Sequence, residues 1–75
     1  MTTTATNYKV RTYGEALNDT TDNFNTKKEA VSFMRKMYSF MVEMEAQTFI
    51  LLKVDFEDGE DYLTEINTKY TIHNY

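Results

Sequence analysis

The chain contains no cysteine, no proline and no tryptophan, and only two glycines and one histidine among its 75 residues. Without cysteine there is neither a disulfide framework nor a thiolate zinc site, which are the usual reinforcements of a small domain. A domain of this size buries only about 60% of the surface that its unfolded chain exposes, so its stability is marginal. Association with a second copy or with another partner is the remaining way to bury more surface.

Long apolar runs are also missing. No segment approaches the roughly 18 apolar residues of a membrane span, and the Thr-rich start lacks the basic and apolar parts of a signal peptide. We therefore expect a cytoplasmic protein without a membrane partner. We expect residues 1–6 to be disordered and residues 7–75 to form a single α+β domain.

Charge is distributed unevenly along the chain, whose net charge is -4. Residues 1–42 contain six Lys or Arg against four acidic residues, whereas residues 43–75 contain two against eight. Such a dipolar molecule is suited to docking on a basic surface rather than to binding nucleic acid. The plain alternative is that the acidic residues only keep the protein in solution.

Residues 49–56, Phe-Ile-Leu-Leu-Lys-Val-Asp-Phe, are the most strand-like run and predict the central strand. The alternating run 8–13 predicts a strand that Gly14 ends, and residues 20–24 could form a short strand paired back on it. A last strand is expected over residues 62–72.

The clearest local signal is a helix start. The run Thr26-Lys27-Lys28-Glu29 is a capping box, in which the Thr26 hydroxyl accepts from the Glu29 amide and the Glu29 carboxylate reaches back to the Thr26 amide. The residues that follow predict a helix over 27–45, because they include no glycine and consist mainly of good helix formers. The predicted fold class is therefore α+β: a three- or four-stranded antiparallel sheet with one long helix packed on one face, in the order β(β)αββ.

The length of the turn between the last two strands determines which side of one strand pairs with which side of the other. A two-residue turn at Asp58-Gly59 would pair Val54 with Leu63 and set an apolar side against a polar side. We therefore expect a longer loop over residues 57–61, which pairs Val54 with Thr64 and separates the like charges. The core predicted on this basis comprises Val10, Phe24, Ala30, Met34, Met37, Met41, Ile50, Leu52, Val54, Ile66 and Tyr70.

The sequence has more apolar residues than one thin sheet can hide. The predicted helix has an apolar arc of roughly 200°, and the side of the central strand that carries Phe49 and Leu51 is expected to face outward. This surplus predicts a homodimer. The outward residues expected to take part are Phe33, Phe40, Val42, Phe49 and Leu51.

Catalysis is not indicated. The single histidine, His73, has no Ser, Cys or carboxylate at a telling distance in the sequence, so no pair of nucleophile and base can be assembled, and we expect no enzyme. The acidic residues of 55–61 lack the ligand spacing of a calcium-binding EF-hand loop, and no glycine-rich phosphate loop is present. We expect neither a metal nor a cofactor.

Basic residues in the N-terminal half support an alternative function. The run from Phe24 to Ala30 resembles the Phe-x-Thr-Lys-x-Glu-Ala helix start of arm-binding domains of phage-type integrases, which implies DNA binding. The rest of the chain departs from that pattern, because two strands follow the helix and the net charge is negative. The alternative is a homodimeric accessory or DNA-binding module that uses the basic helix face. The basic residues concerned are Lys9, Arg11, Lys27, Lys28, Arg35 and Lys36.

The chain as a whole resembles the very short, acidic, cysteine-free α+β inhibitor proteins of phages and mobile elements, including anti-CRISPR proteins. The likeness is one of type and not of motif. In several of those families acidic side chains occupy a basic groove meant for DNA, so the resemblance implies an inhibitor of a host protein, such as a CRISPR effector, in the bacterial cytoplasm. The carboxylates expected to bind that protein are Asp55, Glu57, Asp58, Glu60, Asp61 and Glu65.

Overall fold

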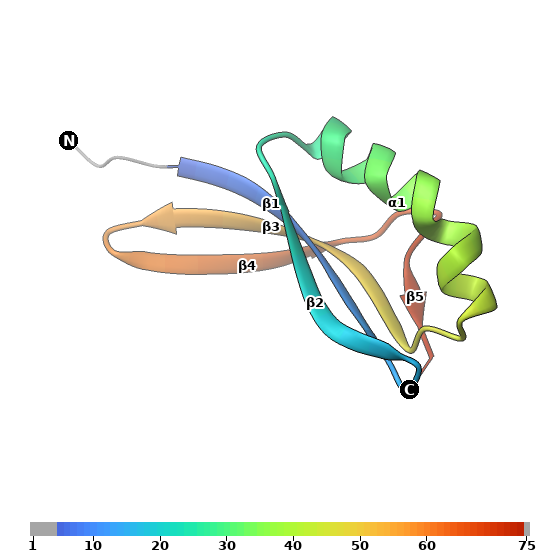
Figure 1. The fold of residues 1–75 in the computed structure, drawn as a ribbon. Coiled ribbons are helices and arrows are strands. Elements are labelled where there is room, and N and C mark those ends of the chain that lie inside the picture. Colours follow the sequence, from blue (N-terminus) through green and yellow to red (C-terminus); the bar gives the residue numbers. More distant parts are fainter. Residues whose placement is uncertain (1–4, 75) are drawn as a thin grey trace.

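The computed structural model describes residues 5–74. This part of the chain forms, in order, β1 (Ala5–Gly14), β2 (Leu17–Phe24), α1 (Lys27–Glu43), β3 (Thr48–Glu57), β4 (Glu60–Ile66) and β5 (Ile72–His73). All strand pairs are antiparallel, in the order β2-β1-β3-β4, and β5 pairs with the start of β3. Helix α1 lies against one face of the sheet (Figure 1), which confirms the predicted α+β class.

The helix ends follow from local chemistry. The Glu29 amide donates to the Thr26 hydroxyl oxygen at 3.2 Å, which confirms Thr26 as the N-cap, while the Glu29 carboxylate accepts from that hydroxyl at 3.1 Å. The helix ends at Glu43, two residues earlier than predicted. There Glu45 turns into the left-handed region with φ of 56°, and the Ala46 amide donates to the Met41 carbonyl at 2.9 Å, as in a Schellman motif.

Several strand boundaries differ from the prediction. Strand β1 includes Ala5 and Thr6, which the sequence placed in a disordered start, and the other four residues of that start lie outside the described residues. The single strand expected over 62–72 is interrupted after Ile66, because the Thr71 hydroxyl accepts from the Thr68 amide at 2.9 Å and holds a turn before β5. The uncertain strand over 20–24 is present and longer, as β2.

The helix covers the face of the sheet that carries Phe49 and Leu51, not the face that carries Ile50 and Leu52. Phe49 and Leu51 are fully buried, so their predicted outward position is wrong, as is the core position of Ile50 and Leu52, which are half-buried on the other face. The cause is the register with β1, since Leu51 pairs with Val10 and so shares its side under the helix. The core cluster comprises Val10, Ala30, Met34, Met41, Ala46, Phe49, Leu51 and Ile72.

Other predicted core residues lie at the margin of this cluster: Phe24, Met37, Ile66 and Tyr70 pack against it while partly buried. Val54 is buried as predicted, but it lies on the face opposite the helix. Phe33, one of the expected outward residues, packs on Phe24 with ring centroids 5.2 Å apart. Of the surplus apolar residues, Phe40 and Val42 remain exposed on the helix.

The β3–β4 hairpin uses the short turn that the sequence argument rejected. Asp58 and Gly59 both have positive φ, 53° and 80°, and Val54 pairs with Leu63. Two residues with positive φ form a type I′ turn, whose twist matches that of the flanking strands and which favours Asp-Gly. The expected loop over 57–61 is therefore wrong: the turn geometry outweighs the repulsion between Glu57 and Glu60, which now lie directly opposite each other.

The molecule is elongated, with principal extents of 47, 21 and 17 Å. Figure 1 shows the cause, since the β3–β4 hairpin and the start of β1 continue well beyond the end of the helix. The hairpin tip is therefore the part of the sheet that lies farthest from the core beneath α1.

Thr12 supplies a test of the packing beneath the helix. Its side chain is only 3% exposed, and within residues 5–74 its hydroxyl has no hydrogen-bond partner. An unpaired buried hydroxyl costs roughly 1 to 3 kcal/mol, and valine suits a strand better. We expect Thr12→Val to raise the free energy of unfolding by about 1 kcal/mol in urea titrations. The exposed Thr20→Val on β2 is the control, and an equal gain there would point to strand propensity alone.

Candidate functional site

The tip of the β3–β4 hairpin carries the acidic residues singled out by the sequence. Glu57, Asp58, Glu60 and Asp61 are all exposed around the Asp58-Gly59 turn. Within residues 5–74, the side chains of Glu57, Asp58 and Asp61 make no hydrogen bond or ion pair. Their carboxylates are therefore fully available to an external partner. The name acidic tip is used for Glu57, Asp58, Glu60 and Asp61.

Two neighbouring carboxylates are already engaged. Asp55 accepts a hydrogen bond from the Thr6 hydroxyl at 2.8 Å and lies 3.8 Å from the Lys53 ammonium group. Glu60 accepts from the Tyr62 hydroxyl at 3.0 Å. Asp55 is half-buried and so contributes less accessible charge than the acidic tip.

Glu65 is not part of the tip. It pairs with Leu52, well down the hairpin, and its carboxylate lies 2.7 Å from the His73 ring nitrogen Nε2. The structure therefore brings together five of the six predicted site residues. Glu65 lies within the sheet, away from the turn. The separation arises because Glu65 is four positions along β4 from Asp61, and each strand residue advances about 3.3 Å.

The basic residues of the helix gather at a second surface. Lys27, Lys28 and Arg35 border a groove of about 510 Å³ between α1 and the loop that joins β4 to β5, and Lys69 borders it from that loop. The name basic groove is used for this hollow. Lys69 is not among the basic residues predicted from the sequence, because its position depends on the break after Ile66. Lys36 borders the adjoining hollow with Lys28 and Phe33, while Lys9 and Arg11 lie on the other side of the sheet.

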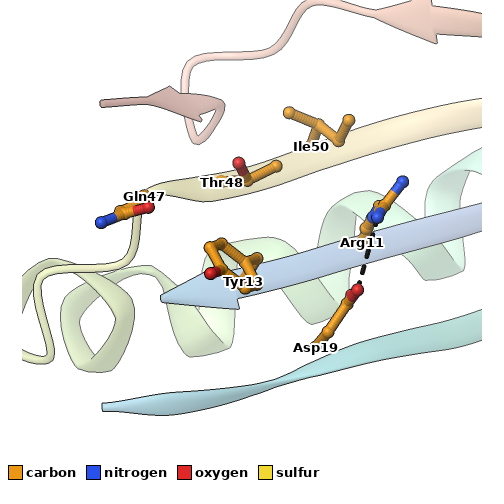
Figure 2. A pocket seen from close by; sticks show the side chains of 6 residues that line it. All are labelled: Arg11, Tyr13, Asp19, Gln47, Thr48 and Ile50. Atoms are coloured by element: carbon orange, nitrogen blue, oxygen red, sulfur yellow. Dashed lines mark hydrogen bonds and ion pairs between the residues drawn. The ribbon is translucent and has the colours of Figure 1, made fainter. Parts of the chain in front are cut away.

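The face of the sheet away from α1, here called the open face, has no covering element in the described chain. Figure 2 shows part of it with the helix behind the strands: Arg11 and Asp19 form an ion pair at 3.3 Å beside Tyr13 and Ile50. This hollow has a volume of about 420 Å³. A neighbouring hollow of about 300 Å³ shares Arg11 and Asp19 and extends to Leu52 and Leu63.

Within residues 5–74, no three or more His, Asp or Glu side chains come together as a metal-binding group. The described chain also has no helix with the length and apolarity needed to cross a membrane. Comparison with protein-family models, with curated proteins and with solved structures found no match to this chain. Its function therefore has to follow from the chemistry of the acidic tip, the basic groove and the open face.

Proposed function

We propose that this protein is a small phage-type inhibitor whose acidic tip enters a basic nucleic-acid-binding site of a host protein, such as a CRISPR effector. The observation that carries the proposal is the hairpin, which projects far from the core (Figure 1). Its tip carries four exposed acidic residues. Three of them have no side-chain partner within the described residues. The tip thus acts as a mimic of nucleic acid, offering carboxylates to Lys and Arg side chains as a phosphate backbone does.

The charges of the acidic tip do not stabilise the free hairpin, which favours a role for them in binding a partner. Glu57 and Glu60 lie directly opposite each other across the hairpin, and like charges in this position destabilise a strand pair. The turn itself needs only Asp58 and Gly59, which supply the two positive φ angles. A basic partner removes the repulsion, so the charges that weaken the free hairpin strengthen the complex.

Neutralising the acidic tip tests this proposal. The variant carries Glu57→Gln, Asp58→Asn, Glu60→Gln and Asp61→Asn, and its matched control carries the corresponding amides at Glu15, Asp22, Glu43 and Glu45, all outside the hairpin. Both should fold, and the tip variant should melt at the same temperature as the parent or slightly higher. The partner captured from a bacterial lysate by the parent should bind the tip variant about tenfold more weakly for each close charge pair lost, with a flatter salt dependence.

Two results of that comparison would count against the acidic tip. One is equal affinity of the parent and the tip variant for the captured partner. The other is an equal loss in the control variant, which would make net charge, rather than the tip, the cause of binding.

A second candidate function is direct DNA binding, and the basic groove favours it. Four cations, Lys69 together with Lys27, Lys28 and Arg35, border one hollow, and its lining includes no carboxylate. Cations clustered in this way can neutralise phosphates and bind DNA with a strong salt dependence. Changing Lys27, Lys28, Arg35 and Lys36 to Gln distinguishes the two functions. If the variant with these four Gln substitutions no longer binds DNA, while the acidic-tip variant still binds it, the protein is a DNA-binding module.

A further inference from the structure

We infer that the open face is the interface between two copies of this chain. The inference is independent of the proposed function, since it concerns the sheet between the hairpin tip and β5. It also departs from the dimer surface expected from the sequence, because Phe49 and Leu51 are buried beneath the helix.

The open face has an apolar spine along β3. Ile50, Leu52, Val54 and Phe56 alternate onto this side, and Leu63 of β4 lies beside Val54. Leu63 is 60% exposed and Phe56 43% exposed. A row of this kind on an uncovered face resembles one inner face of a β-sandwich, in which two sheets pack with their strands within about 30° of each other.

The charges on either side of this spine are of opposite sign. Strand β1, on one side, places Lys9 on the open face together with Arg11, which is paired with Asp19; strand β4, on the other side, places Glu65 there, beside His73. One cross-strand row shows the pattern directly, because Lys9 and Glu65 both pair with Leu52 from opposite sides. They are two strand spacings apart, about 10 Å between backbones, and no ion pair joins them within one copy.

This arrangement of charges is self-complementary for one orientation of a twofold axis between two copies. With a twofold axis parallel to β3, the second copy lays its β4 over β1 of the first, and Lys9 meets Glu65 of the second copy twice, while Leu52 packs on its counterpart. A twofold axis across the strands would instead lay β1 on β1 and set Lys9 against Lys9. Charge complementarity therefore favours a second copy of the chain as the partner of the open face. It also favours the twofold axis parallel to β3 over the axis across the strands.

The open face is long. A specific interface removes about 800 Å² from each partner, and the sheet extends along the 47 Å axis of the molecule (Figure 1). The exposed apolar residues of the helix do not form a comparable surface. Phe40 and Val42 are two positions apart on the helix, about 200° around its axis, so they point in different directions.

Sedimentation velocity of the full chain at micromolar concentration tests the inference. The parent should be a dimer, and Leu63→Lys should weaken the dimer about tenfold or more, because it places a charge in the apolar spine. Val42→Lys is the matched control, since Val42 is also exposed, at 52%, but lies on the helix. Circular dichroism confirms that each variant is folded.

A charge exchange supplies the second measurement and does not depend on Leu63. Lys9→Glu and Glu65→Lys should each weaken the dimer about tenfold or more, and the double variant should recover most of the loss, because the opposite charges meet again between copies. Lys36→Glu makes the same charge change on the helix and should leave the dimer unaffected. A monomeric parent, an unaltered dimer in the Leu63→Lys variant, or a double variant no tighter than the single variants would each overturn the inference.

Discussion

Replacing Phe49 with alanine should destabilise the protein by roughly 3 to 5 kcal/mol, the usual cost of truncating a fully buried phenylalanine. Phe49 is completely buried in the core cluster, between β1 and β5 and beneath α1. A domain of this length has a total stability of only about 4 to 11 kcal/mol. The variant should therefore lose a large part of its free energy of unfolding, as measured by urea denaturation followed by circular dichroism.

Phe56→Ala is the matched control for Phe49→Ala. The two residues lie on the same strand, but Phe56 lies near the hairpin tip on the open face and is 43% exposed. With both variants in the Leu63→Lys background, so that dimer formation does not contribute, its truncation should cost much less than that of Phe49, because fewer buried contacts are lost. Equal losses in the two variants would mean that the core does not lie where the helix covers the sheet.

The adjacent leucines of β3 should differ in the same way. Leu51→Ala should cost roughly 2 to 5 kcal/mol, because Leu51 is fully buried under the helix, whereas Leu52→Ala should cost less, because Leu52 is half-buried on the open face. Both variants are best measured in the Leu63→Lys background, so that dimer formation does not add to the loss at Leu52. A larger effect at Leu52 than at Leu51 would reverse the assignment of the two faces.

These leucines show where prediction from sequence succeeds and where it stops. The helix start at Thr26, the end of β1 at Gly14 and the central position of β3 follow from local chemistry, and the structure confirms each of them. Which face of β3 is covered does not follow, because residues 49–52 are all apolar and alternation carries no signal in such a run. The covered face is fixed by pairing with β1, and that pairing is a property of the whole fold.

The register of the hairpin was predicted wrongly for a related reason. The prediction assumed that the apolar side of β3 pairs with the apolar side of β4, which excluded Val54 opposite Leu63. The Asp58-Gly59 turn overrides that rule, since its two positive φ angles match the strand twist. This pairing places Leu63 on the open face, where it lies beside the apolar spine of β3.

The candidate surfaces were predictable in different degrees. The acidic tip follows from sequence alone, because its members are neighbours around one turn. Glu65 and Lys69 could not be placed, since their positions depend on where β4 ends and on how the Thr68 to Thr71 turn redirects the chain. Residues whose location depends on a break in a strand need the three-dimensional structure.

The pairing of β1 with β3 has a consequence for how the chain acquires this fold. Residues 5–13 of β1 pair with residues of β3 that lie 35 to 51 positions later in the chain, whereas β1 and β2 form a local hairpin. Contacts so distant in sequence form slowly, because a long loop must close before they contribute. During synthesis the β1–β2 hairpin can form only locally until β3 has emerged, and until then the edge of β1 that pairs with β3 has no partner and is open to pairing with another nascent chain.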